Sequence, residues 1–245
     1  MGRVMRALVV ADVHDVKGFR RLVELIEEYK PEFVLGCGDW GSRKRMEGYS
    51  YEIYNLALEE IEDLFREIIS RTRLYTVYGN HDELELIKYL KNVDGSPIWL
   101  RDFEVRNVAG MRVMGLNGLI TLTGRGIYHV AESEFRRKMV EFLKSGAKVE
   151  VVVSHDAPKY FSDKIVNKNG NIYHAGHELL SEALTVLRPR LWLHGHIHSQ
   201  QYERSFGQLV VCVGSFLRDN YVVLSGEDVE IYQNGVLRER IKLFR

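Results

Sequence analysis

Short runs of β-branched and other apolar residues alternate along this chain with longer segments in which apolar residues recur every three or four positions. Residues 6–10 form the first run, and the helical pattern after it is ended by Pro31. Residues 33–35 and 74–78 repeat the strand pattern on either side of a long amphipathic stretch over 54–69. Strands joined by helical crossovers pair in parallel, so the first half of the chain predicts an α/β sheet.

The second half of the chain adds hairpin patterns to these crossovers. Residues 103–105 and 111–114 flank an Ala-Gly turn, which indicates neighbouring antiparallel strands, and nearly all of the chain from residue 209 onward has strand composition. We therefore expect an α/β fold of two mixed β-sheets packed together with helices outside, formed by residues 1–245 as a single domain with no separate cap domain. The other expected elements are helices near 83–90, 133–143 and 177–187 and strands at 149–153 and 191–193.

Charge and composition argue against two classes of protein, polybasic nucleic-acid binders and membrane proteins. The chain has 34 Lys and Arg residues and 34 Asp and Glu residues, which excludes a nucleic-acid binder that works through a large excess of positive charge. The first apolar stretch is only a few residues long, so we expect neither a signal peptide nor a membrane span of about 20 residues. A cytoplasmic protein without membrane association is the resulting expectation. Cys37 and Cys212 lie inside apolar runs and are expected to be core residues.

Five of the apolar runs end abruptly in clusters of His, Asp, Asn and Gly. The carboxyl ends of strands in α/β sheets form the ligand crevice, so all five clusters can converge on one place. Taken alone, an Asp at such a position is more often a helix N-cap, and a His is more often a hydrogen-bonded turn residue. Five strand ends with the same chemistry favour a metal site instead. The clusters are Asp12-Val13-His14, Gly38-Asp39, Gly79-Asn80-His81-Asp82, Ser154-His155 and Gly195-His196-Ile197-His198.

The donor atoms in these clusters indicate which kind of metal site to expect. Without a usable thiolate, a Cys-based structural zinc site is excluded. Seven side chains are too many for one ion of four to six ligands and suit two ions, and a shared carboxylate would hold them about 3.5–4 Å apart. Mixed nitrogen and oxygen donors suit Mn²⁺, Ni²⁺, Zn²⁺, Fe²⁺ or Co²⁺ better than Ca²⁺ or Mg²⁺. Among these ions we expect Mn²⁺. The donors are Asp12, His14, Asp39, Asn80, His155, His196 and His198.

The order and spacing of these motifs resemble the calcineurin-like metallophosphoesterase family across residues 12–198. The resemblance implies a four-layer αββα sandwich with a dinuclear metal site at the edge of the sheets. GNHD and GHIH together with DVH and GD are far more specific than any one of them. The matching motifs are DVH at 12–14, GDWG at 38–41, GNHD at 79–82, SH at 154–155 and GHIH at 195–198.

The resemblance also implies a role for each motif residue. His81 matches the family histidine that contacts the scissile phosphate and protonates the leaving oxygen, and Asp82 would orient it. Hydrolysis would use a hydroxide bridging two ions, which also polarise the phosphoryl oxygens. The implied ligands are Asp12, His14 and His198 for the first ion, Asn80, His155 and His196 for the second, and Asp39 as the bridge.

These observations favour a metal-dependent phosphoesterase, and within that class a phosphodiesterase. The chain has no long insertion between motifs that would enclose a small monoester, so the site should be open. A phosphomonoesterase remains an alternative. A nuclease acting on DNA or RNA is favoured by the basic run Arg43-Lys44-Arg45 and disfavoured by the zero net charge. A non-catalytic, protein-binding scaffold of the same fold is the remaining alternative, and its mark would be the loss of His81 or of a ligand.

Residues outside the motifs give weaker expectations about substrate and assembly. Arg43 follows the Asp39 loop, Asn117 follows the strand pattern at 111–116, and Arg125 and His129 lie in a Gly-flanked loop. We take these four side chains as candidate contacts to a phosphate-ester substrate, with nucleotide-derived esters included. Nucleic acid is left open but not favoured, and assembly into a homo-oligomer is left open.

Overall fold

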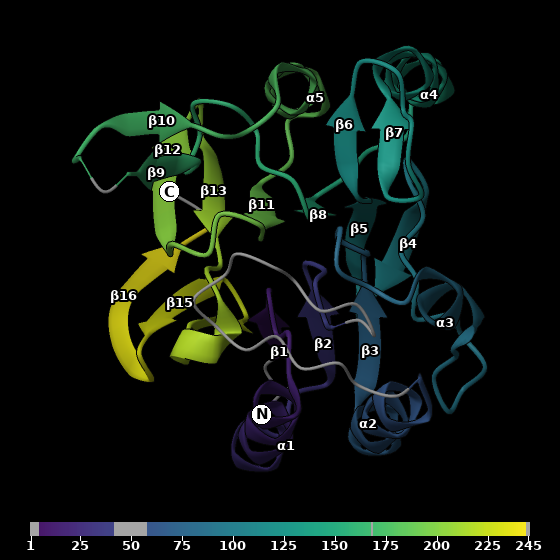
Figure 1. Cartoon of the computed structure of the whole chain (residues 1–245), viewed down its shortest axis with the longest axis vertical. Coiled ribbons are helices and arrows are strands. Elements are labelled where there is room, and N and C mark those ends of the chain that lie inside the picture. Colours follow the sequence, from purple (N-terminus) through teal and green to yellow (C-terminus); the bar gives the residue numbers. More distant parts are fainter. Residues whose placement is uncertain (1–4, 42–57, 168, 244–245) are drawn as a thin grey trace.

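The fold was analysed in a computed structural model, which describes residues 5–41, 58–167 and 169–243. Two six-stranded mixed sheets lie face to face at its centre, and helices cover both outer faces (Figure 1). The expected α/β architecture of two mixed sheets with helices outside is therefore confirmed. No helix in the described part of the chain is long and apolar enough to cross a membrane.

The first sheet has the strand order β16-β15-β14-β1-β2-β3. Its parallel half consists of β1 (Arg6–Val10), β2 (Phe33–Gly36) and β3 (Arg73–Thr76), connected through α1 (Val16–Tyr29) and α2 (Leu58–Arg71). The antiparallel half is a meander formed by the C-terminal part of the chain, as the sequence predicts. It contains β14 (Tyr221–Ser225), β15 (Asp228–Gln233) and β16 (Val236–Lys242).

The second sheet has the strand order β12-β13-β11-β8-β5-β4. Its four inner strands are parallel, and β4 and β12 pair antiparallel at the two edges. Its strands are β4 (Val105–Val108), β5 (Met111–Leu116), β8 (Val151–Ser154), β11 (Leu191–His194), β12 (Gln201–Ser205) and β13 (Gln208–Cys212). The other α-helices of the described chain are α3 (Leu84–Tyr89), α4 (Glu132–Ser145) and α5 (Glu178–Leu187).

Alternating side chains of the central strands build the three large cores of the described structure. On β1, Leu8 contributes to the core under α1 and α2, whereas Val9 contributes to the core between the two sheets. On β11, Leu193 contributes to the core between the sheets, and Trp192 contributes to the core under α4 and α5. Both faces of each sheet are therefore buried, which explains the nearly continuous apolar runs of the central strands. Figure 1 shows the resulting order of helix, sheet, sheet and helix layers.

Several boundaries differ from the sequence expectations for local reasons. β3 ends at Thr76 rather than at residue 78 because the Tyr78 N–H leaves the ladder and donates to Asn117 Oδ1 at 3.0 Å. β4 begins at Val105 rather than at residue 103, after a left-handed φ of 58° at Phe103. α2 begins at Leu58 among the described residues, so the expected start of this helix at residue 54 lies outside them.

Two small sheets were not predicted from the sequence. β6 (Leu119–Thr121) pairs with β7 (His129–Ala131), and β9 (Lys164–Val166) pairs with β10 (Ile172–His174). Strands of three residues are too short for a clear alternation of apolar and polar positions. A 3₁₀ turn over Phe216–Arg218 was missed as well.

Candidate metal centre

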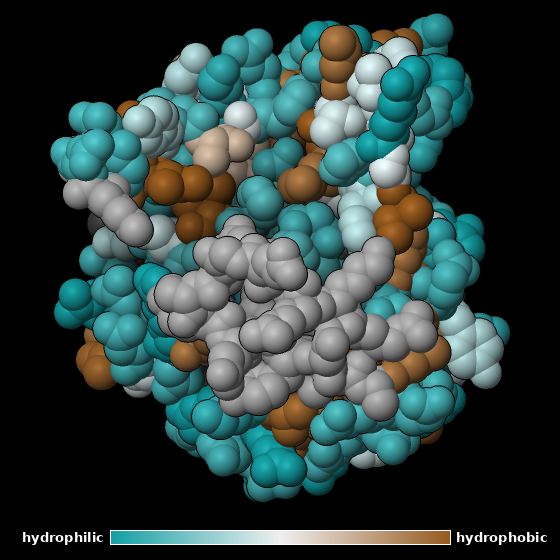
Figure 2. All heavy atoms as spheres, viewed as in Figure 1, coloured by the Kyte–Doolittle hydropathy of each residue, from teal (hydrophilic) through white to brown (hydrophobic). Residues whose placement is uncertain are grey.

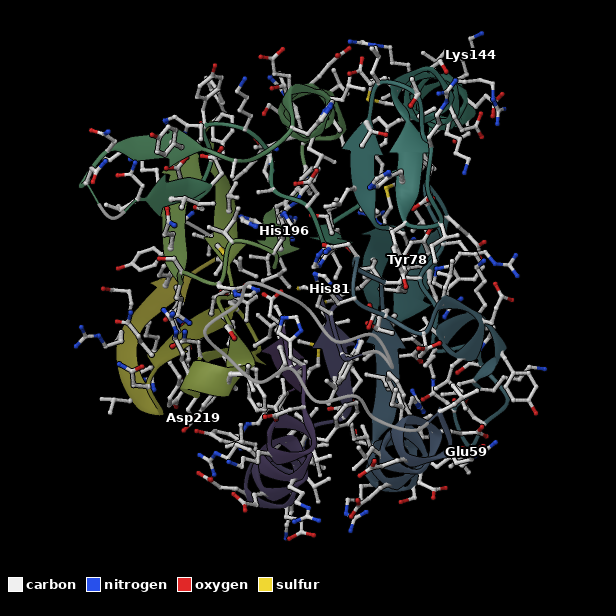
Figure 3. All side chains as sticks on the ribbon, in the orientation of Figure 1. Glu59, Tyr78, His81, Lys144, His196 and Asp219 are labelled. Carbon is white, nitrogen blue, oxygen red and sulfur yellow. The ribbon has the colours of Figure 1, made fainter. Side chains whose placement is uncertain are left out.

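The five polar clusters lie at the carboxyl ends of strands from both sheets. Asp12 and His14 follow β1, Asp39 follows β2, and His155 follows β8. Figure 3 shows His81 and His196 near the middle of the same face, close to where the strands of the two sheets end. The convergence that the sequence predicts is therefore present in the fold.

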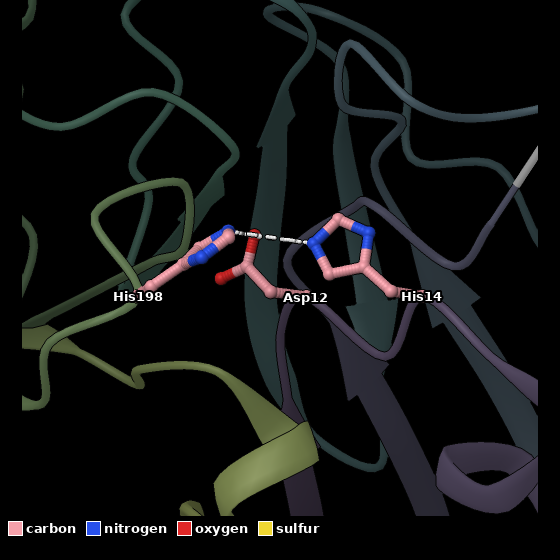
Figure 4. A group of neighbouring side chains, drawn as sticks. All are labelled: Asp12, His14 and His198. Atoms are coloured by element: carbon pink, nitrogen blue, oxygen red, sulfur yellow. Dashed lines mark hydrogen bonds and ion pairs between the residues drawn. The ribbon is translucent and has the colours of Figure 1, made fainter. Parts of the chain in front are cut away.

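Asp12, His14 and His198 form the first group of potential ligands. One ligand atom from each lies within 4.8 Å of the others. The two imidazoles face each other across the Asp12 carboxylate, with 3.4 Å between His14 Nε2 and His198 Nε2 (Figure 4). The Asp12 Oδ1 atom lies 3.4 Å from His198 Nε2 and 3.9 Å from His14 Nε2. The three side chains could therefore hold one ion between them.

Asp39 and His155 form the second group together with Asp12. His155 Nδ1 donates to the carbonyl oxygen of Cys37 at 2.9 Å, so a neutral ring carries its lone pair on Nε2. That lone pair points to Asn80 Oδ1 at 3.0 Å and lies 3.5 Å from Asp39 Oδ2. Three electron-pair donors thus face one point, an arrangement that a cation would satisfy.

Asp39 Oδ2 is a buried atom of this centre that lacks a hydrogen-bond partner. It is buried and accepts no hydrogen bond from the described residues, and it lies 4.0 Å from His14 Nε2. Burial raises the pKa of Asp39 well above its usual value, and the Asp12 carboxylate raises it further. A buried carboxylate with an unpaired oxygen between two imidazoles is costly unless positive charge is supplied there. The residues present therefore fit divalent cations, with Asp39 Oδ2 between the two groups.

The imidazole rings are largely in the form that binds metals. Burial lowers the pKa of His14 to about 4 and that of His196 to about 3, so both rings are neutral at pH 7. His198 differs: burial opposes protonation, but the hydrogen bond and charge of Asp12 raise its pKa above the usual value. His196 is also tied to the first group because its backbone N–H lies 3.1 Å from Asp12 Oδ2.

His81 and Asp82 are held by the loop after β3. The His81 N–H donates to Asp39 Oδ1 at 2.8 Å, and Asn80 Nδ2 lies 2.5 Å from His81 Nε2. The Asp82 carboxylate accepts N–H groups of Asp39, Trp40 and Gly79 at 2.9, 2.7 and 2.7 Å. Asp82 therefore braces the loop backbone on which His81 lies, and the direct orientation of the His81 ring stays a prediction.

Close packing and strain accompany the candidate ligands. A Cβ at Gly79 would lie 2.1 Å from Asp39 Oδ1, so only glycine allows this approach of the loop. Five of the seven candidate ligands have a left-handed backbone with φ between 53° and 65°. Such conformations cost about 1–3 kcal/mol each and cluster at functional sites. The five residues are Asp12, His14, Asp39, His196 and His198.

The four expected substrate contacts have different surroundings. Arg43 lies outside the described residues. Asn117 is a structural residue: its Oδ1 accepts from Tyr78 N and Trp99 Nε1, each at 3.0 Å, and its Nδ2 donates to two further oxygens. A substrate would have to displace one of these bonds. Arg125 lies in the loop between β6 and β7, and His129 is the first residue of β7, with its Nδ1 2.5 Å from the Arg125 carbonyl oxygen.

One neighbour of the site was missed in the sequence. The segment after β13 brings Ser215 to the centre, where its N–H donates to the His198 carbonyl at 3.2 Å. Three residues later, the positive charge of Arg218 opposes protonation of His198. The Arg218 guanidinium therefore lies near the group of Asp12, His14 and His198. The apolar run over 209–213 ends in Gly-Ser, so the rule that found the five clusters could have pointed to this sixth strand end.

Comparisons with known proteins agree with this geometry. A family profile described as calcineurin-like phosphoesterase matches residues 5–200. Among solved structures, TT1561 of Thermus thermophilus is 14% identical with a TM-score of 0.71, over 94% of this chain and 99% of that one. GAP50, the anchor in the inner membrane complex of Plasmodium, is 13% identical with a TM-score of 0.61, over 99% of this chain and 89% of that one.

A dimetal phosphatase from Danio rerio is 10% identical with a TM-score of 0.57, over 99% of both chains. At these identities the structural likeness shows a common fold only. A search of curated proteins gave no match. The family profile, however, spans well over half of the chain and includes all five polar clusters. The resemblance seen in the motifs is thereby confirmed, and the chain belongs to the calcineurin-like phosphoesterase family.

Proposed function

We propose that this protein hydrolyses phosphate esters, with a preference for diesters, at a pair of divalent transition-metal ions. The observation that carries the proposal is the unpartnered, buried Asp39 Oδ2 between His14 and His155. In this proposal Asp12, His14 and His198 would hold one ion, and Asp39 would be shared with the second. Asn80, His155 and His196 would complete the second ion's ligands.

The chain's own residues would divide the remaining work. Two divalent ions, when bound, would supply the Lewis acidity that polarises phosphoryl oxygens and activates water near neutral pH. His81 is only partly buried, which leaves its ring accessible to a bound ester, and it would act as the proton donor to the leaving oxygen. Arg218 adds positive charge near the same edge and would help to hold the anionic phosphate.

The protonation state of His81 depends on the substrate in this scheme. Burial lowers the pKa of His81 to about 4, with the neighbouring imidazoles as further causes, so the ring is neutral in the free protein at pH 7. A phosphate anion placed against the ring favours its charged form. In this scheme the neutral ring takes up a proton from solvent when the phosphate binds, and then passes it to the leaving oxygen.

The test is the activity of metal-stripped protein reconstituted in parallel with Mn²⁺, Ni²⁺, Zn²⁺ or Mg²⁺. Each form is assayed on an aryl phosphodiester, an aryl phosphomonoester, a cyclic nucleotide and single-stranded DNA. We expect hydrolysis of the diester, restored by Mn²⁺ or another transition metal more than by Mg²⁺. Faster cleavage of DNA would favour the nuclease instead. Two bound ions without activity on any of the four substrates would contradict the proposal and favour the scaffold.

A further inference from the structure

A cavity of about 730 Å³ lies between α2, α3 and the residues that precede β7. This volume is within the usual range of small-molecule sites. None of the seven candidate metal ligands is among its described lining residues. The cavity is thus a separate feature of the molecule beside the metal centre. Its apolar walls come from Leu58, Leu84, Leu86, Tyr89, Ile127 and Tyr128.

The cavity and the metal centre share the loop after β3. Asp82 and Glu83 line the cavity, and His81 immediately precedes them. The Tyr128 hydroxyl donates to the Asp82 carbonyl oxygen at 2.8 Å, while the Asp82 carboxylate accepts the Asp39 N–H at 2.9 Å. One short segment therefore joins the cavity wall to the candidate proton donor and to the candidate bridging carboxylate.

Two of the wall residues are unusually exposed for their type. Tyr89 has a relative exposure of 68% and Ile127 has one of 62%. Covering such surface is favourable by roughly 25 cal/mol per Å² of apolar area. On the face shown in Figure 2, hydrophobic surface lies between the start of β7 and α3. The exposed wall therefore favours an apolar occupant.

The charges along the cavity disfavour a polyanion. The charged residues among its described lining are acidic, and none is Lys or Arg. Glu62 is paired with Arg66 at 2.9 Å, and Glu85 is paired with Lys88 at 3.2 Å, so two of the carboxylates are neutralised by neighbours. A phosphate backbone would find no Lys or Arg side chain among the described residues of this wall. A neutral apolar group would meet no such penalty.

We propose that this cavity binds the apolar part of the leaving alcohol, so that the substrates are phosphate esters of hydrophobic alcohols rather than nucleic acids. The inference rests on the proposed function because it assigns the cavity to the leaving group that His81 protonates. Alkyl or aromatic groups packed against Tyr89 and Ile127 would hold the ester oxygen at the His81 end of the cavity. Specificity for the leaving group then comes from α3 and the β7 loop, and the metal ligands have no part in it.

The kinetic test compares diesters with ethyl and hexyl leaving alcohols, whose intrinsic reactivities are similar. We expect the metal-loaded wild type to show at least a tenfold higher kcat/KM for the hexyl ester. Ile127→Ser should lower kcat/KM for the hexyl ester about tenfold and leave the ethyl ester unchanged. The matched control is Phe206→Ser, because Phe206 is 84% exposed in the turn between β12 and β13 and does not line the cavity. Both esters should be hydrolysed normally by this control.

A binding measurement separates the cavity from the chemistry. Titration of metal-stripped protein with 2-naphthol should show binding to the wild type and to His81→Ala, and a loss of at least tenfold in affinity for Ile127→Ser. Equal kcat/KM for the two esters, with naphthol binding unchanged in Ile127→Ser, overturns the inference and leaves the proposed function standing. Specific naphthol binding without hydrolysis of any ester by the metal-loaded wild type overturns the proposed function instead.

Discussion

The substitution Asp39→Asn should change stability in opposite directions with and without metal. Asp39 is 1% exposed, and its ligand oxygen lies within 4.8 Å of one on the Asp12 carboxylate. Two unit charges 4.8 Å apart repel by about 3.5 kcal/mol at an effective dielectric constant of about 20. Asn has nearly the same shape and keeps an acceptor for the His81 N–H, but carries no charge. The metal-free variant should therefore be more stable than the metal-free wild type.

This repulsion sets an upper limit on the gain. Burial and the Asp12 charge raise the pKa of Asp39, so partial protonation in the wild type removes part of the repulsion. In a chain of this size 1 kcal/mol shifts the Tm by roughly 2–4 °C. The metal-free variant should then melt higher by up to about 7–14 °C. Metal should reverse the order, because two ions, each at 100 times its Kd, would together add about 5.4 kcal/mol to the wild type that binds them.

Calorimetric melting in EDTA and in excess Mn²⁺ measures both effects. Asp163→Asn is the matched control, because Asp163 is a fully buried carboxylate outside the centre that pairs with His174 at 2.6 Å. This control should melt lower than the wild type by a similar amount in both conditions. The reasoning is refuted if Asp39→Asn melts lower than the wild type in EDTA, or if it retains the full Mn²⁺-induced rise.

Three further substitutions test separate parts of the account. His81→Ala should keep its metal content, measured by elemental analysis, and lose about 10²–10⁴-fold in kcat on an ester with a poor leaving group; full activity would refute the proton-donor role. Asn117→Ala should lose more than about 2 kcal/mol of unfolding free energy in urea with kcat/KM unchanged, because its four hydrogen bonds are structural; a raised KM at normal stability would mark a substrate contact instead. Burial raises the pKa of Asp102 above 3.8, so the native protein binds this proton more tightly than the unfolded chain and loses stability as pH rises from 3.8 through the raised value. Urea unfolding at several pH values should show that Asp102→Asn lacks this part of the slope, and identical slopes would contradict the assignment.

The five strand-end clusters were predictable because each depends on a local pattern. A buried strand followed by glycine and polar residues can be recognised in the sequence, and in an α/β sheet such ends must meet at one edge. Gly79 belongs to such a pattern, but the reason that only glycine fits there is the close approach of Asp39 in the folded protein. The family and the layered fold follow from the same segments and are confirmed.

What the sequence did not reveal depends on tertiary contacts. The Asp82 carboxylate binds backbone N–H groups that only the folded loop brings together, and Arg218 reaches the centre through a strand that ends far along the chain. The cavity wall combines Tyr89 and Ile127, which lie 38 positions apart and look like ordinary surface residues in the sequence. Metal identity, a single domain, cytoplasmic location and assembly state stay predictions.

The central claim is that two metal ions lie between the two groups of ligands. Anomalous diffraction from crystals grown with Mn²⁺ tests it most directly. The account predicts two anomalous peaks about 3.5–4 Å apart, one among Asp12, His14 and His198 and one beside His155, with Asp39 between them. A single peak, or no peak at these side chains in crystals of active protein, would contradict it.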